Sequence, residues 1–321
     1  MLHAQGLPNH RSDHGCSRLF PHRRRGRASG SGMGCPDWPK CFGQWIPPTD
    51  ESQLPDNYQE IYHDRGYADT TFNVVKTWTE YINRLVGVTI GILIFMTLVS
   101  SFSYRRTDPT VTALSFFSFL LVAFQGWLGA KVVESNLVPL TITIHMLVAL
   151  LLVSVLLYVV VRAQRSFFNF GCVHPNPAIA ALLVIALVLS LAQVLLGTQV
   201  RESIDEISAS FGGTDRFRWA EFLGVGFYIH RTFSLLVFAT STALAIKIFK
   251  HTKDLGLLQI CSVAALALVV LEIATGVTLY YLDMPAILQP VHLLLANLVF
   301  GLQFFMILAY RYGRPEIQHA A

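Results

Sequence analysis

Three histidines lie inside long apolar segments, where ionisable side chains are rare and usually mark a functional site. They are His145, His230 and His292, each within the first dozen residues from the outer end of its segment. A neutral imidazole binds haem iron through one ring nitrogen, and two histidines on facing helices of a bundle can hold one haem. His230 and His292 are therefore a candidate pair of haem ligands. The alternative is a pair of core histidines that hydrogen-bond backbone or water.

An internal repeat supports the ligand interpretation. Residues 81–84 read YINR and recur as YIHR at 228–231, an offset of 147 residues. The same offset relates three further pairs, which are Gln125 and Glu272, Gly129 and Gly276, and His145 and His292. These matches predict two four-helix units related by pseudo-symmetry, a plan that is common in membrane proteins.

Two arginines directly follow the candidate ligand positions. Arg84 follows Asn83, and Arg231 follows His230. A guanidinium near the membrane edge can pair with a carboxylate through two parallel hydrogen bonds, and haem propionates are natural candidates. The alternative is that each arginine extends to the membrane interface to reach water.

One carboxylate distinguishes the two repeats. Glu80 and Asn83 are three residues apart and share a helix face, whereas the repeat places Phe227 opposite Glu80. The asymmetry predicts that one unit holds a cofactor through two histidines and the other holds a molecule that is transformed beside Glu80. A glutamate at a membrane boundary can also be a solvated residue at a helix start. Glu272, in mid-helix, is a further candidate proton carrier or hydrogen-bond partner.

Two cysteines lie close together ahead of the first apolar segment. Cys35 and Cys41 flank five residues that include two prolines, so a disulfide could close this short loop. The outer compartment permits such a bond. A metal pair is less favoured, because no histidine or further cysteine lies close by in this loop.

The elements that must position these residues are membrane-spanning helices. Hydrophobic residues make up 53% of the 321 residues, charged residues make up 14%, and the mean hydropathy is +0.49. Soluble domains carry about 25% charged residues. The lipid interior offers no hydrogen-bond partners to backbone N–H and C=O groups, so apolar runs of about 20 residues that cross it must be helices. The sequence predicts an all-α polytopic membrane protein with spans near 81–102, 111–130, 138–161, 178–199, 221–247, 257–280 and 286–310.

The short loops predict the orientation. Basic residues gather on one side, which the positive-inside rule makes cytoplasmic together with the C-terminus; they are Arg105, Arg106, Arg162, Arg165, Lys247, Lys250, Lys253, Arg311 and Arg314. Segment 28–78 and the loops near 131–137, 200–220 and 281–285 then face outward.

Residues 1–27 do not fit this plan. They hold six arginines and no apolar run, although the repeat predicts a helix there as the counterpart of 178–199. We therefore expect this basic segment not to be native to the fold, through a wrong start site, a frameshift or a truncation, and the missing helix puts the activity of such a chain in doubt. The alternative is a genuine seven-helix variant.

The motifs together resemble a known family. Residues 30–43, which read GSGMGCPDWPKCFG, resemble the first outer loop of haem A synthases, and EYINR at 80–84 resembles that family's Glu-Tyr-x-His-Arg motif. The similarity runs from about residue 27 to residue 314. The family oxidises a ring methyl of haem O to a formyl group, which gives haem A for cytochrome oxidase assembly.

The resemblance implies a role for each unit. Residues 178–314 would bind a haem b cofactor through His230 and His292, and residues 28–161 would bind haem O. Glu80 would take part in catalysis, and Cys35 and Cys41 would form the disulfide. Asn83 replaces the motif's histidine, so His145 would be the remaining axial ligand in that unit, with the other iron position open or reached from Asn83 through a water.

The resemblance also implies a setting and partners. We expect an integral protein of the bacterial inner membrane that contacts lipid, haem O synthase and cytochrome oxidase assembly factors, and no nucleic acid. An electron-transferring di-haem cytochrome b would explain the histidines and arginines, but not Glu80 or the cysteine pair. A repeat-built transporter ranks third, because the prolines lie mainly at helix ends.

Overall fold

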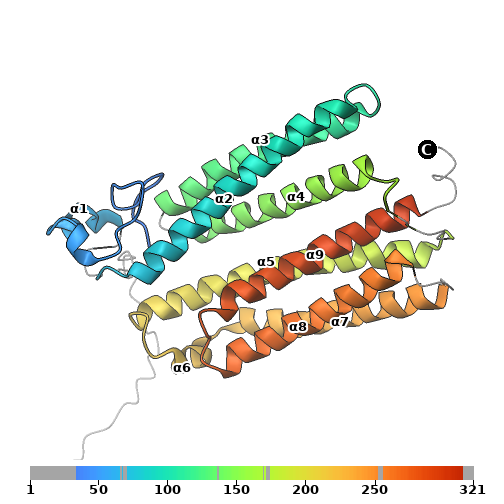
Figure 1. The fold of residues 1–321 in the computed structure, drawn as a ribbon. Helices are drawn as coiled ribbons and strands as arrows, with labels where there is room; N and C mark the ends of the chain where they lie inside the picture. Colours follow the sequence, from blue (N-terminus) through green and yellow to red (C-terminus); the bar gives the residue numbers. More distant parts are fainter. Residues whose placement is uncertain are drawn as a thin grey trace, which may run out of the picture.

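The computed structural model describes residues 34–65, 67, 71–135, 137–168, 170, 174–251 and 256–313. Within these ranges the chain forms helices and no strand, and its long helices lie side by side along one direction (Figure 1). The long helices are α2 (Val74–Ser101), α3 (Pro109–Glu134), α4 (Pro139–Ala163), α5 (Pro177–Ser210), α7 (Val225–His251), α8 (Leu257–Tyr281) and α9 (Leu288–Tyr312). The short ones are η1 (Glu51–Gln53), α1 (Tyr58–Ile61), η2 (His63–Arg65), η3 (Phe102–Tyr104), α6 (Arg216–Trp219) and η4 (Ala220–Phe222).

Local sequence explains where several helices begin. Proline occupies the first turn of α3, α4 and α5, where its missing N–H would have had no partner in the helix. Asn73 caps α2 by accepting a hydrogen bond from the Lys76 amide, and Asn176 caps α5 by accepting from the Ala178 amide. These caps lie at the ends of the apolar segments, so each helix starts close to the membrane boundary.

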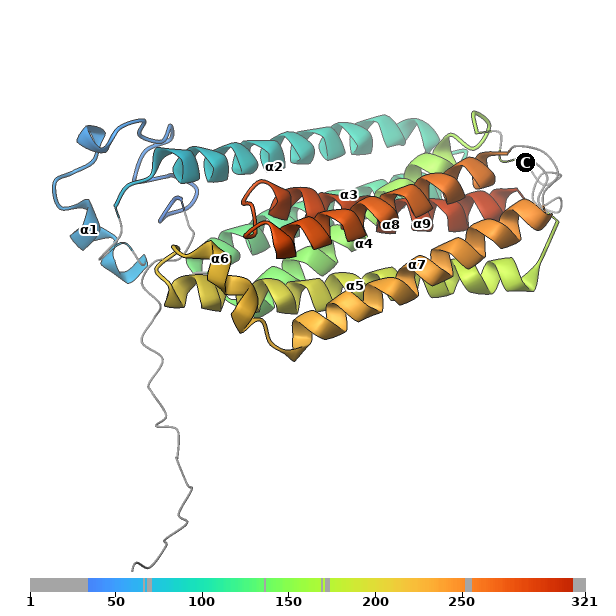
Figure 2. The same ribbon diagram turned by 90° about the horizontal axis from the view of Figure 1, so that it is seen from below.

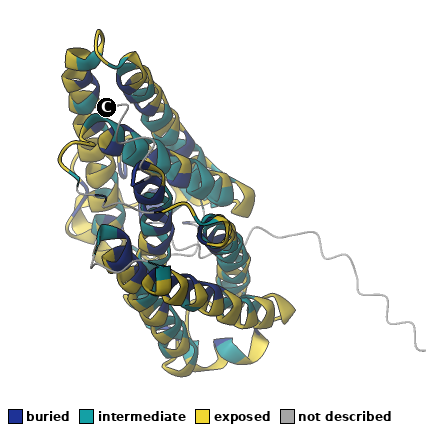
Figure 3. Ribbon diagram, turned by 90° about the vertical axis from the view of Figure 1, so that its right-hand side faces the viewer, coloured by how far each residue is buried: buried dark blue, intermediate teal, exposed yellow. Residues whose placement is uncertain are grey.

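The predicted membrane-spanning class is confirmed. Seven helices in the described ranges are long and apolar enough to cross a bilayer. Much of their apolar surface faces outward, as the exposed residues on the outer faces of the bundle show in Figure 3. Apolar side chains that face outward suit contact with lipid. The chain is therefore an integral membrane protein.

The second unit is a closed four-helix bundle. Helix α5 packs against α7 and α9, and α8 packs against the same two helices. Val237, Val269 and Val299 form a buried cluster inside it. At the end of the bundle where α7 and α9 end, buried side chains such as Ile179, Ile248 and Met306 fill the interior.

The first unit has three described helices. Helix α3 packs against both α2 and α4, and α4 also packs along α9 and α5 of the second unit (Figures 1 and 2). Leu150, Val194 and Phe300 form the buried contact between the units. The helix expected as the counterpart of α5 would fall within residues 1–27, which lie outside the described residues.

The predicted helix boundaries need correction at several ends. Helix α2 begins at Val74 and not near residue 81, and α3 continues to Glu134, through part of the loop expected near 131–137. The largest difference lies at the end of α5. Segment 200–220 was expected to be an outer loop, but α5 continues through it as far as Ser210. Ile204 and Ile207 give this extension an apolar side that packs near Trp219, and Arg201 lies 3.6 Å from Asp205 one turn away. Spacings of three and four residues place these side chains on common helix faces, which favours helix over loop.

Candidate functional site

His230 and His292 face each other inside the second unit. His230 lies on α7 and His292 on α9, with ring centroids 6.4 Å apart and ring planes inclined by 73°. A metal atom between two imidazoles makes a bond of about 2 Å to a nitrogen of each ring. When the distance from each nitrogen to its ring centre is added, the two ring centroids lie roughly 6 Å apart. The observed separation fits one metal atom between the two rings.

Glycines leave room for these imidazoles. A methyl group at Gly197 of α5 would lie 3.3 Å from His230 Cε1, and one at Gly276 of α8 would lie 3.3 Å from His292 Cε1. Any larger side chain would press on the rings, so both helices approach the histidines more closely than other residues would allow.

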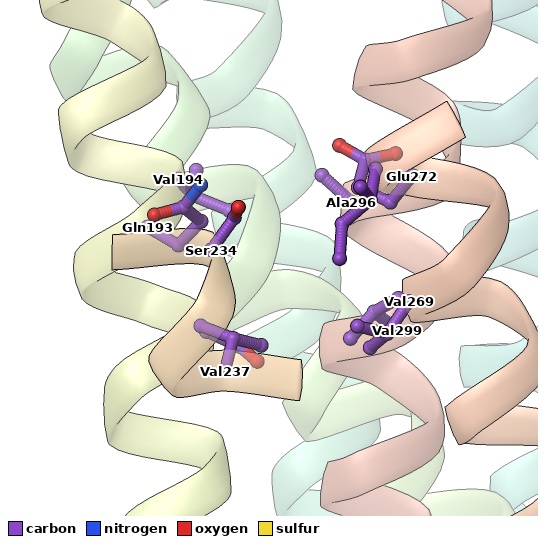
Figure 4. Close-up of a pocket in the computed structure, with 10 residues that line it drawn as sticks. Gln193, Val194, Ser234, Val237, Val269, Glu272, Ala296 and Val299 are labelled. Atoms are coloured by element: carbon purple, nitrogen blue, oxygen red, sulfur yellow. The ribbon is translucent and has the colours of Figure 1, made fainter. Parts of the chain in front are cut away.

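A pocket opens one helical turn from the histidine pair. Its volume is about 40 Å³, which is smaller than the range of about 300–1,000 Å³ typical of ligand sites. Gln193 of α5 and Ser234 of α7 lie across it from Glu272 of α8 and Ala296 of α9 (Figure 4). Every helix of the closed bundle thus contributes to its wall.

Polar groups contact the histidines from neighbouring helices. Thr275 Oγ1 lies 2.9 Å and Glu272 Oε1 lies 3.3 Å from His292 Nδ1. Gln193 Nε2 donates to the backbone oxygen of His230 at 3.1 Å. The mid-helix glutamate predicted as a hydrogen-bond partner is therefore adjacent to a candidate ligand.

The donor set favours haem iron over a bare metal ion. In the described part of the chain, no group of three or more His, Cys, Asp or Glu side chains could hold a metal. Two histidines suffice for haem, because the porphyrin supplies the other four nitrogens. The residues present therefore fit a haem.

The first unit repeats part of this arrangement. A methyl group at Gly129 of α3 would lie 3.5 Å from His145 Cε1, and Gln125 Nε2 donates to the His145 backbone oxygen at 2.9 Å. Asn83 is exposed on α2. This unit has one histidine at the repeat-related position and an amide where the second unit has His230.

The cysteine loop is attached to α2. Cys35 and Cys41 form a disulfide, as the family resemblance implied, and both side chains are fully buried. Phe42 packs next to them against Tyr58 and Tyr67, and burial raises the pKa of the Tyr67 hydroxyl. The loop and the following short helices form a small folded cap at one end of α2 (Figure 1).

Glu80 and Arg84 hold this loop in place. Glu80 Oε2 accepts hydrogen bonds from the amides of Gly34 (2.7 Å) and Cys35 (3.1 Å). Arg84 Nη2 lies 2.5 Å from Glu80 Oε1, and Arg84 Nη1 donates to the backbone oxygens of Asp37 and Lys40. The predicted catalytic carboxylate and the predicted propionate partner are thus both engaged by the loop.

The repeat-related residues in the second unit are placed differently. Arg231 is exposed, and its guanidinium lies 5.3 Å from the ring centre of Tyr228. Phe227, at the position of Glu80, stacks on Tyr280 with centroids 5.0 Å apart. The guanidinium of Arg231 is more available to a ligand than that of Arg84.

Sequence reasoning missed Thr275, Gln193 and Gly197. Thr275 lies three residues after Glu272, so the two share a helix face, and this spacing was a usable signal. Gln193 is a polar residue within an apolar helix, which is itself a signal of function. The contact of Gly197 depends on how α5 packs on α7, which no local pattern predicts.

The fold and the two histidine-bearing units define a duplicated helical-bundle membrane protein with a site suited to haem. Comparison with known proteins agrees: the chain belongs to the COX15-CtaA family of cytochrome oxidase assembly proteins, which matches residues 26–304.

Individual relatives carry the name haem A synthase. The protein from Shewanella oneidensis is 31% identical over 173 residues, which is 53% of this chain and 49% of that protein, so the match spans about half of that relative. The proteins from Shouchella clausii and Rickettsia prowazekii are 23% and 22% identical, over 87% and 86% of this chain and 88% and 89% of their own lengths. No solved structure matches the chain significantly.

Proposed function

We propose that this chain is an oxidoreductase that converts haem O to haem A, by oxidising a ring methyl to a formyl group, and so serves cytochrome oxidase assembly. The observation that carries the proposal is the facing pair His230 and His292 in a glycine-lined, closed bundle, next to the first unit, whose described helices have one histidine, His145, at the related positions. Membership of the assembly-protein family and the names of the relatives support it.

The second unit (residues 178–314) would hold haem b as the permanent cofactor. His230 and His292 are the proposed axial ligands, and the exposed Arg231 is the proposed partner of a propionate. Haem b supplies one-electron redox chemistry when bound. Val237 and Val299 give the pocket next to this pair an apolar part of its wall.

The first unit (residues 28–161) would bind haem O, with His145 as its axial ligand. Asn83 lies one turn from Glu80 on α2 and would face the open side of the iron. Glu80 would act on the substrate while the outer loop holds it, and the Cys35–Cys41 disulfide would then lie beside the substrate site. Arg84 would position Glu80 and the loop.

The proposed setting is a bacterial inner membrane. Basic residues end α4, α7 and α9, and these three helices end at the same end of the bundle (Figure 1), which the positive-inside rule assigns to the cytoplasm. The disulfide loop at the opposite end would then face the oxidising compartment. Haem O synthase and assembly factors are the proposed partners.

Haem extraction and chromatography test the reaction. Membranes that contain this chain and a haem O synthase should yield haem A, and membranes with the synthase alone should yield only haem O. His230→Ala and His292→Ala should each abolish the six-coordinate low-spin spectrum of bound haem, because each removes one axial ligand. His63→Ala, which changes an exposed histidine of the outer cap, is the matched control.

The other outcomes identify the alternatives. Haem O that stays unchanged while haem b is bound would favour an electron-transferring cytochrome b. A protein that purifies colourless would favour a transporter. A six-coordinate spectrum retained in both histidine variants would overturn the ligand assignment.

A further inference from the structure

The proton on the His292 ring can be placed from its contacts. The Thr275 hydroxyl donates to the backbone oxygen of Glu272 at 2.9 Å. A hydroxyl has one proton and a carbonyl oxygen can only accept, so this contact uses the Thr275 proton. The contact between Thr275 Oγ1 and His292 Nδ1, at 2.9 Å, must then have the ring nitrogen as its donor.

Glu272 lies close to the same ring nitrogen. Its Oε1 is 3.3 Å from His292 Nδ1, where it can be a second acceptor for the proton that the Thr275 contact places there. A neutral imidazole that carries its proton on Nδ1 has its lone pair on Nε2. His292 is therefore oriented with Nε2 as the nitrogen that can bind a metal.

The other two histidines have no such support. His230 Nδ1 and His145 Nδ1 are both buried and find no hydrogen-bond partner among the described residues. No described side chain therefore accepts a proton from Nδ1 of either ring, and the ring contact of His230 is at its other nitrogen, where Gln193 Nε2 lies 3.5 Å from His230 Nε2.

The repeat shows that the first unit differs at the same two positions. An offset of 147 residues puts Gln125 where the second unit has Glu272, and Leu128 where it has Thr275. Gln125 directs its amide to the His145 backbone and not to the ring, and Leu128 has no polar group to offer. Among the described residues, an acceptor for the ring nitrogen Nδ1 is thus found at His292 and not at His145.

We propose that Thr275 and Glu272 are positioning residues that hold His292 as a permanent axial ligand, and that their absence around His145 lets the first unit exchange its haem. This inference rests on the proposed function, in which one unit keeps a cofactor and the other must release a product. An ionisable side chain in the middle of a membrane is energetically costly, and it is usually found where it interacts with a partner. Groups that hydrogen-bond a metal-bound histidine orient its ring and raise its basicity.

Removing the acceptor from Thr275 tests the proposal. Thr275→Val keeps the shape of the side chain and removes its oxygen, and Thr275→Ser restores the oxygen. Thr278→Val is the matched control, because Thr278 donates to the Ala274 backbone oxygen of the same helix and makes no hydrogen bond to a histidine among the described residues. The measurements are the rate of haem transfer from the purified protein to excess apomyoglobin and the midpoint potential of the bound haem.

We expect Thr275→Val to lose haem about 10- to 100-fold faster than the wild type, the usual effect of removing such a partner. The midpoint potential should rise, because a less basic imidazole stabilises ferric iron less. Thr275→Ser and Thr278→Val should behave as the wild type. Glu272→Gln should shift the potential in the same direction by a smaller amount, because the amide oxygen still accepts.

Two results would overturn the inference, and they can be told apart. A wild-type protein with bound haem, whose loss rate and potential are unchanged in Thr275→Val, would refute the role of Thr275 and leave the proposed function standing. A wild-type protein that binds no haem would refute the proposed function and this inference together.

Discussion

Replacing Glu80 with alanine should release the disulfide loop from α2. The carboxylate accepts hydrogen bonds from the Gly34 and Cys35 amides and pairs with Arg84, and its side chain is only 22% exposed. In the variant these three donors lose their shared acceptor. The loop should therefore open more often without unfolding of the helices.

The magnitude follows from the number of bonds. A hydrogen bond to a charged group contributes about 1.5–3 kcal/mol, and the partial exposure of Glu80 places both amide bonds at the lower end. Together they contribute about 3 kcal/mol to keeping the loop closed. At about 1.4 kcal/mol for each factor of ten, the open population should rise about 100-fold.

Two measurements report this opening. Hydrogen exchange at the Gly34 and Cys35 amides should accelerate about 100-fold in Glu80→Ala. Reduction of the Cys35–Cys41 disulfide by a small thiol should accelerate similarly, because both cysteines are fully buried and attack requires the loop to open. Glu60→Ala, which removes an exposed carboxylate from α1, is the control and should change neither rate.

The same variants separate the two roles of Glu80. Unchanged exchange and reduction rates in Glu80→Ala would refute the idea that this carboxylate holds the loop. Arg84→Ala keeps the carboxylate and loses the bonds to Asp37 and Lys40. Loss of haem A in both variants would assign Glu80 to loop positioning, whereas loss in Glu80→Ala alone would assign it to the reaction.

Two further predictions concern other contacts. Arg162 lowers the pKa of Asp108 in the folded protein below its ordinary value of 3.8. This ion pair therefore stabilises the fold fully when the pH is above 3.8. Its contribution is lost as the pH falls through the lower pKa of the folded state. Thermal unfolding between about pH 3 and pH 5 should therefore be less pH-dependent in Asp108→Asn, and an unchanged slope would exclude this pair as a cause. Gly126→Ala, with open space around the added methyl, should stabilise the protein by about 0.5–1 kcal/mol. In Gly276→Ala the added methyl would crowd His292, which should destabilise the protein by about 1–3 kcal/mol and so cancel the same gain. This variant should also bind haem more weakly in a titration. Equal stabilisation of both glycine variants would contradict this reasoning.

The helices and the repeat could be predicted because their signals are local or periodic. Lipid compels a long apolar run to be a helix, so composition alone defined the class. The offset of 147 residues then paired His145 with His292 before any helix was placed in space. The extension of α5 was missed because segment 200–210 is amphipathic, and such a segment is shorter and more polar than the apolar runs that mark spans.

The sequence by itself determined the residue types that can do chemistry and the helices that carry them. Only the tertiary structure decided what those residues contact. Glu80 meets amides 45 and 46 residues away, and Thr275 meets a ring on the next helix, 17 residues along the chain. The physical reason is that helix formation depends on each segment and its solvent, whereas the partner of a polar side chain depends on how separate helices and loops pack together.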